Sequence, residues 1–206
     1  MHLPLSLFSL GAISAFALGL ASCSSTSVSL DYQPRLVQTV PGPRAVAAGR
    51  FGDMRGEDPY LLGVVRTPIG TPLEKVTTNV PLEQVVRNSF AYGLKTRQML
   101  LPEGVAPFIL TGEVLQFEVK QIVHPAAYVK IRVTVMRSGS GQVVYSKVFK
   151  SDREGDIYLP GSGSPVPTLS IMGSRALQDV VDHALDDVTL RSALEGPPPP
   201  PGPPTY

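Results

Sequence analysis

The sequence predicts an α+β fold: a two-layer sandwich in which a mainly antiparallel sheet carries two amphipathic helices packed on one face. Two segments repeat apolar residues at helical spacing, and three consecutive segments between them show the apolar and polar alternation of strands. A sheet with one apolar face and two helices with apolar stripes can bury these surfaces against each other. The predicted order is therefore short strands, a helix, three strands and a second helix.

The first half of the domain contains short strands and one clear helix. Residues 45–51 form a short apolar strand, and residues 61–78 contain one or two edge strands whose pairing is limited by Pro68 and Pro72. A helix is predicted over residues 81–99, because proline suits a first turn and a glutamate follows near the positive end of the helix dipole. Its apolar stripe consists of Leu82, Val85, Val86, Phe90 and Leu94.

Three strands follow over residues 108–122, 128–136 and 143–151, and they predict an antiparallel meander with one covered face. In the first of them, the parity of the inward residues changes at Val114 and Leu115. A β-bulge at this pair would explain the change.

A second amphipathic helix is predicted over residues 169–194, after a loop rich in Gly, Ser and Pro. The chain then becomes proline-rich over residues 196–206, which excludes a helix or a central strand there. We interpret this end as a disordered tail, with a docking tail or spacer as the alternative.

The length of 206 residues fits one domain, which we expect over residues 45–195. Residues 23–44 are polar and contain prolines, so we expect a flexible tether that docks at most in part. The 18 Lys+Arg and 17 Asp+Glu give a formal net charge of +1. This balance predicts no nucleic-acid partner, because such proteins gather a basic excess on one face.

The first 22 residues contain no Lys, Arg, Asp or Glu. Within them, residues 3–18 form an apolar run of about 16 residues, which is the size of the apolar region of a signal peptide and short for a membrane span. We therefore expect residues 1–22 to be an export signal.

The signal ends in Leu20-Ala21-Ser22-Cys23, which resembles the lipobox of bacterial lipoprotein precursors. The resemblance implies cleavage between Ser22 and Cys23, a diacylglyceryl group on the Cys23 thiol and an acyl chain such as palmitate on the new amino group. Two or three acyl chains form an anchor that does not readily leave a membrane. In enteric bacteria an Asp after the lipidated cysteine favours the inner membrane, so Ser24 implies the outer membrane, facing the periplasm.

Three alternatives for Cys23 stay open: a buried structural thiol, a reactive or dimer-forming thiol, and an uncleaved signal anchor. Because the chain has a single cysteine, an internal disulfide, a CxxC redox pair and a multi-cysteine metal site are excluded.

Several segments together resemble the YajG-like family of bacterial lipoproteins. These are the lipobox, Asp53-x-Arg55 followed by Leu62-Gly63, and the sequences PLEQVVRNSFAYGLKTRQM, FILTGEVLQFEV and LQDVVDHALDDVTLRSAL. The auxiliary lipoproteins of ABC-type transport systems have a similar order of elements and are the rival resemblance. Neither resemblance implies a catalytic residue.

The sequence contains no phosphate-binding GxxxxGK[ST] loop, GxGxxG turn, HExxH metal motif or GxSxG elbow. His183 and Asp187 are one helical turn apart, but two ligands do not make a metal site and an exposed polar face is the simpler interpretation. His124 precedes a proline and is interpreted as a turn residue. Asp53 and Arg55 are expected to pair and hold the turn after the first strand.

The sequence SDREGD places Asp152, Glu154 and Asp156 around Arg153, which we interpret as a solvated loop because the ligand order of an EF-hand is absent. We expect no catalytic residue, no cofactor and no metal. The favoured function is a lipid-anchored, non-catalytic envelope module that binds a protein partner or a lipid carrier. An auxiliary lipoprotein of ABC-type lipid transport is the alternative, and a small periplasmic hydrolase is a remote one.

Overall fold

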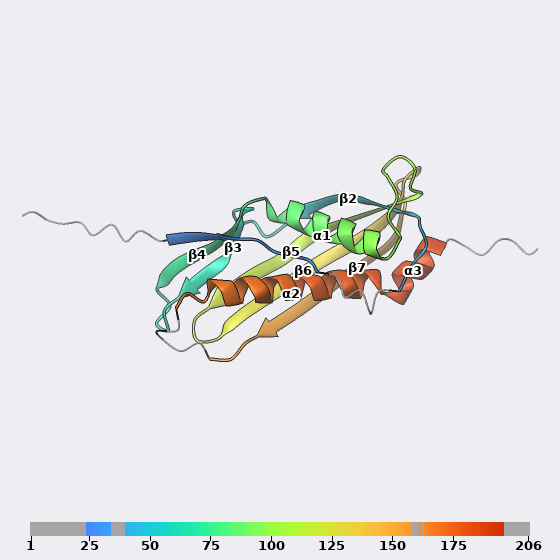
Figure 1. The fold of residues 1–206 in the computed structure, drawn as a ribbon. Coiled ribbons are helices and arrows are strands. Elements are labelled where there is room, and N and C mark those ends of the chain that lie inside the picture. Colours follow the sequence, from blue (N-terminus) through green and yellow to red (C-terminus); the bar gives the residue numbers. More distant parts are fainter. Residues whose placement is uncertain (1–23, 34–39, 158–160, 162, 196–206) are drawn as a thin grey trace, which may run out of the picture.

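The computed structural model describes residues 24–33, 40–157, 161 and 163–195. Seven strands and three helices form an open, mixed sheet with the helices along one face (Figure 1). The predicted α+β fold is therefore confirmed. The elements are β1 (Ser24–Val28), β2 (Val46–Asp53), β3 (Leu61–Arg66), β4 (Pro72–Thr78), α1 (Leu82–Thr96), β5 (Phe108–Gln121), β6 (Pro125–Arg137), β7 (Val143–Glu154), α2 (Val166–Leu185) and α3 (Val188–Glu195).

The strand order is β1-β4-β3-β5-β6-β7, and β2 also pairs with β5. The meander β5-β6-β7 is antiparallel, as the sequence predicts. The hairpin β3-β4 is also antiparallel, whereas β1 on β4 and both β2 and β3 on β5 are parallel. The long strand β5 pairs with β2 along its first half, up to Val114, and with β3 from Val119 onward. The register between β5 and β6 shifts between Val114 and Gln116, which confirms the predicted bulge.

The helices bury one face of the sheet. Helix α1 places Val86, Phe90 and Leu94 in the core, and the Phe90 ring stacks on Phe51 of β2 with centroids 4.9 Å apart. Helix α2 covers β5, β6 and β7. The side chains of β6 alternate, with Val129, Ile131, Val133 and Val135 buried under the helices and Lys130 and Arg132 exposed on the other face.

The prediction of one continuous second helix is wrong. Instead of one helix over residues 169–194, the chain forms α2 and then α3. The Asp187 carboxylate accepts a hydrogen bond of 3.0 Å from the backbone N–H of Leu190. A side-chain cap of this kind begins a new helix, and it explains the break between Leu185 and Val188.

The expected flexible tether also differs from the structure, because part of it belongs to the sheet. Ser24–Val28 forms β1 and pairs in parallel with β4, from Ser24 opposite Glu74 to Val28 opposite Thr78. Leu30 then enters the core. The physical reason is an alternation of Val28, Leu30 and Tyr32 that buries one side of an otherwise polar segment.

Candidate functional site

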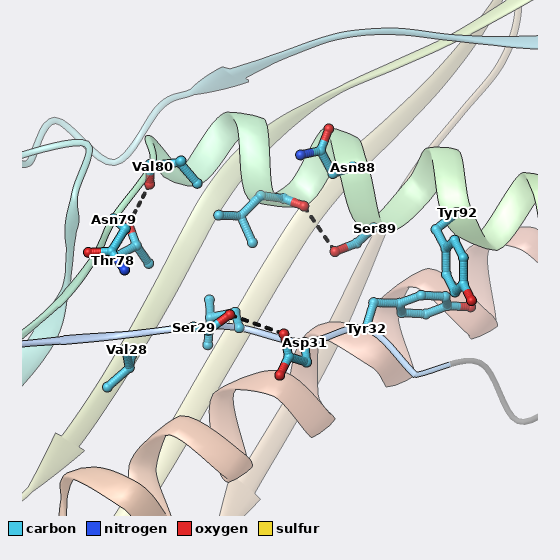
Figure 2. Close-up of a pocket in the computed structure, with 12 residues that line it drawn as sticks. Val28, Ser29, Asp31, Tyr32, Thr78, Asn79, Val80, Asn88, Ser89 and Tyr92 are labelled. Carbon is cyan, nitrogen blue, oxygen red and sulfur yellow. Dashed lines mark hydrogen bonds between the residues drawn. The ribbon is translucent and has the colours of Figure 1, made fainter.

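The amino-terminal segment consists of residues 24–33 and begins with β1. Its part after β1, residues 29–33, lies between α1 and α2 (Figure 2). Leu30 packs close to Gly173 of α2, where a Cβ atom would stand 3.4 Å from the leucine. The backbone N–H of Asp31 donates to the Ser174 hydroxyl over 3.1 Å, and the Ser170 hydroxyl donates to the Ser29 carbonyl over 3.0 Å. The segment is thus fixed to α2 by both apolar and polar contacts.

Near the end of this segment, Tyr32 joins a polar cluster around the buried Arg97, together with Asp182, Asp186 and Arg191, which we call the Arg97 cluster. The Tyr32 hydroxyl donates to Asp182 over 2.7 Å. The Arg97 guanidinium donates to Asp186 over 2.7 and 2.9 Å and to Asp182 over 3.0 Å. Arg191 also donates to Asp186, over 2.7 Å to the Oδ1 atom that accepts from Arg97 Nε, and it donates to the carbonyls of Val40 and Pro41.

Burial and ion pairing set the charges in this cluster. The Arg97 side chain is only 1% exposed. Burial alone would lower the pKa of Arg97, but the hydrogen bonds to Asp186, Tyr32 and Asp182 raise it above its usual value. Burial, and then the hydrogen bond to Asp182, raise the pKa of Tyr32. The arginine therefore stays charged and the tyrosine stays neutral at physiological pH, so the cluster is a stable link between helices and amino-terminal segment.

A cavity of ≈ 370 Å³ opens beside this segment, between it, the turn before α1 and the exposed side of α1. Figure 2 shows Asp31, Asn79, Asn88 and Tyr92 around it. Its lining mixes apolar and neutral polar side chains with one carboxylate, and contains no Lys, Arg, His or Cys among the described residues. The Ser89 hydroxyl donates to the Val85 carbonyl in its own helix over 2.9 Å. Such a lining can bind a small group of mixed polarity. The Ser29 hydroxyl donates to the Asp31 carboxylate over 3.0 Å, and both residues are exposed (Figure 2).

The candidate metal ligands do not come together. His183 is exposed on α2, whereas Asp187 accepts from the Lys147 ammonium over 2.6 Å and caps α3. His124 is exposed in the β5–β6 turn, as expected. Within the described residues, no group of three or more His, Cys, Asp or Glu is placed to hold a metal ion.

The acidic sequence SDREGD is not wholly a loop, because Asp152 and Glu154 belong to β7. Alternation along the strand separates the side chains: Arg153 pairs with Asp179 of α2 over 2.5 Å, while Asp152 lies near Lys150 and Glu154 accepts from the Tyr128 hydroxyl. The acids therefore do not converge on a common point.

Asp53 and Arg55 form the expected pair, with 2.7 Å between Oδ2 and Nη2. The Arg55 Nη1 also donates to the carbonyls of Leu61 and Phe117. Phe117 lies on β5 between the parts paired with β2 and β3, so Arg55 occupies the gap between these two strands. Burial would raise the pKa of Asp53, but the hydrogen bonds from Arg55 outweigh it and lower that pKa.

The predicted lipid attachment at Cys23 and cleavage between Ser22 and Cys23 lie outside the described residues, as do residues 1–22 and 196–206. The next residue, Ser24, is described and is the first residue of β1. In the part of the chain that the structure describes, every helix is too short or too polar to cross a bilayer.

Sequence comparison gives no relatives: no family model and no curated protein matches the chain. Solved structures do match. Protein XCC0632 from Xanthomonas campestris, of family DUF330, has a TM-score of 0.55 at 17% identity, over 84% of this chain and 98% of its own. This match confirms that the fold occurs in a known protein, and at such identity it shows the fold alone.

Two further neighbours are bacterial proteins described as lipoproteins. A minor lipoprotein from Acinetobacter baumannii has a TM-score of 0.39 at 7% identity, over 52% of this chain and 84% of its own. A lipoprotein candidate from Caulobacter crescentus CB15 has a TM-score of 0.42 at 13% identity, over 65% of this chain and 92% of its own. The resemblance to the YajG-like family stays a prediction, because none of these three structures tests it.

Proposed function

We propose that this protein is a lipid-anchored lipoprotein of the bacterial cell envelope and acts as a non-catalytic binding or accessory module facing the periplasm. The observation that supports this proposal best is the position of Cys23. The cysteine completes a lipobox-like sequence and directly precedes β1. Cleavage before Cys23 would therefore remove only the apolar segment and leave every described element in the mature protein.

The described surface supports a binding role. The cavity beside the amino-terminal segment offers neutral polar and apolar groups with one carboxylate, and Asp179, Glu154 and Asp187 are used in ion pairs or hydrogen bonds with other elements. The outer membrane is the proposed location, because Ser24 replaces the aspartate that favours inner-membrane retention.

Replacement of the thiol tests the anchor. In cells fed labelled palmitate, Cys23→Ser is expected to abolish labelling and to release or mislocalise the protein, because no thioether can form. Ser22→Ala is the matched control, since it keeps a small residue before the cleavage point and is expected to label normally. Full labelling of Cys23→Ser would show that Cys23 is not the lipid attachment site.

A second experiment tests which envelope protein this lipoprotein binds. Crosslinking in cells, followed by mass spectrometry of the purified protein, separates the candidates. Recovery of lipid-transporter subunits would support the auxiliary role in ABC-type lipid transport, whereas recovery of peptidoglycan or assembly factors alone would contradict it.

A further inference from the structure

The strand registers bring three chain segments to the end of the sheet where β1 begins. Ser24 lies opposite Glu74, near the start of β4. The last residues of β3 lie opposite the end of β5, and the start of β6 lies opposite the end of β7. We call this the hairpin end. It consists of the β3–β4 hairpin turn (67–71) with Leu73, the β5–β6 turn (122–124) and residues 155–157, and Figure 1 shows these connections together near the start of β1.

The hairpin end exposes large aliphatic side chains from all three segments: Ile69, Leu73, Ile122, Val123 and Ile157. Ile69 is the most prominent, with 90% of its surface exposed. The turn that carries it is well fixed, since the backbone N–H of Thr67 donates to Thr71 over 2.8 Å and that of Gly70 donates to Thr67 over 2.8 Å. Gly70 has φ 92°, which permits the tight turn. The isoleucine is therefore held outward at the tip of an ordered hairpin.

Exposure alone does not select this end, because the opposite end of the sheet also exposes valines, among them Val105, Val143 and Val188. The proposed lipid attachment at Cys23 favours the hairpin end as the one that faces the membrane, because Cys23 precedes the start of β1. Consecutive Cα atoms are about 3.8 Å apart, so Cys23 lies next to Ser24. The Ser24 hydroxyl donates to the Leu73 carbonyl over 3.4 Å, which places the start of β1 beside the hairpin. No spacer residues separate the lipid-bearing cysteine from the sheet.

We propose that the hairpin end rests on the phospholipid bilayer that holds the acyl chains on Cys23, with Ile69 in the interface between headgroups and acyl chains. This inference relies on the proposed lipid anchor. An aliphatic side chain gains free energy when it leaves water for this interface. The bilayer is the expected occupant because Ser24, the residue that follows the acylated cysteine in the sequence, bonds the Leu73 carbonyl, leaving little room for a protein between the hairpin and the membrane.

Fluorescence quenching tests this orientation in the full lipidated protein. Ile69→Cys introduces the single free thiol, because lipidation consumes the thiol of Cys23, and this thiol is labelled with an environment-sensitive dye. The protein is reconstituted in vesicles of phosphatidylethanolamine and phosphatidylglycerol that contain a nitroxide-labelled lipid. The matched control is Val188→Cys, whose residue is 78% exposed at the start of α3.

We expect blue-shifted emission and at least about twofold stronger quenching for the dye at residue 69 than at residue 188. Equal quenching at both positions, in protein that floats with the vesicles, would overturn the orientation and leave the anchor intact. Protein that does not float would overturn the anchor and the orientation together. Blue-shifted emission at residue 69 without stronger nitroxide quenching than at residue 188, in protein that floats with the vesicles, would identify a protein surface, such as a second copy, as the occupant and would also overturn the proposal.

Discussion

Arg97 lies where the amino-terminal segment meets α1 and α2, and its guanidinium takes its partners from these segments and the residue that follows α2. A guanidinium has five N–H donors and no acceptor, so its burial is tolerated only where carboxylates and carbonyls surround it. Asp182 and Asp186 supply the charge, and Tyr32 and the Gly93 carbonyl supply further oxygen atoms. The cluster therefore forms only when the amino-terminal segment and α2 are both in place.

Removal of this guanidinium should strongly destabilise the fold. Arg97→Met keeps the length of the side chain but leaves Asp182 and Asp186 with reduced compensation, so we expect the free energy of unfolding to fall by about 3 kcal/mol or more. Denaturant unfolding of the protein without its lipid measures this change. Lys95→Met alters an exposed cation on the same helix and should stay within about 0.5 kcal/mol. Equal effects of the two substitutions would show that the cluster contributes no specific stability.

At the scale of elements, the unusual feature is that β2 and β3 share one edge of β5. The approach of β3 is very close: a Cβ atom on Gly63 would lie 1.7 Å from the carbonyl oxygen of Val119. The glycine at the Leu62-Gly63 pair is therefore required by the contact between the backbones of β3 and β5. Arg55 bonds the Phe117 carbonyl that lies between the two paired regions.

Gly63→Ala tests this close approach. The added methyl group can be accommodated only if β3 moves away from β5, so we expect a loss of about 3 kcal/mol or more in unfolding free energy. Gly52→Ala in β2 is the matched control, because its Cβ would meet only the Met54 sulfur, at 3.9 Å. A mild effect at residue 63, equal to that at residue 52, would show that the β3–β5 pairing adjusts without cost.

The strongly periodic elements could be predicted from sequence, and the elements defined by long-range contacts could not. The stripes of α1 and α2, the meander and the bulge at Val114 follow from local patterns. The alternation of Val28, Leu30 and Tyr32 was a signal for an ordered segment, but the serines around it favour a linker. The parallel pairing of β1 with β4 and the convergence on Arg97 depend on residues distant in the chain, which no local period reports.

For the whole molecule, β1 would couple the proposed lipid anchor to the orientation of the domain. The strand is hydrogen-bonded to β4, the segment after it is fixed to α2, and Tyr32 joins the Arg97 cluster. With the proposed lipid on Cys23, the domain would begin at the next residue and would have little freedom to turn on the membrane. This rigid connection, together with the exposed aliphatic side chains, accounts for the proposed position of the hairpin end.

A flexible spacer should separate anchoring from orientation. Insertion of ten Ser and Gly residues between Cys23 and Ser24, starting with Ser, leaves β1 intact and adds a mean reach of about 17 Å. We expect unchanged denaturant unfolding and unchanged flotation with vesicles, but lipid quenching of a dye at residue 69 that falls toward the level at residue 188. The reason is that the hairpin end binds the interface weakly unless the short connection between Cys23 and β1 holds it there. Undiminished quenching would show that the hairpin end binds the bilayer through its own side chains, without help from the short connection to the anchor.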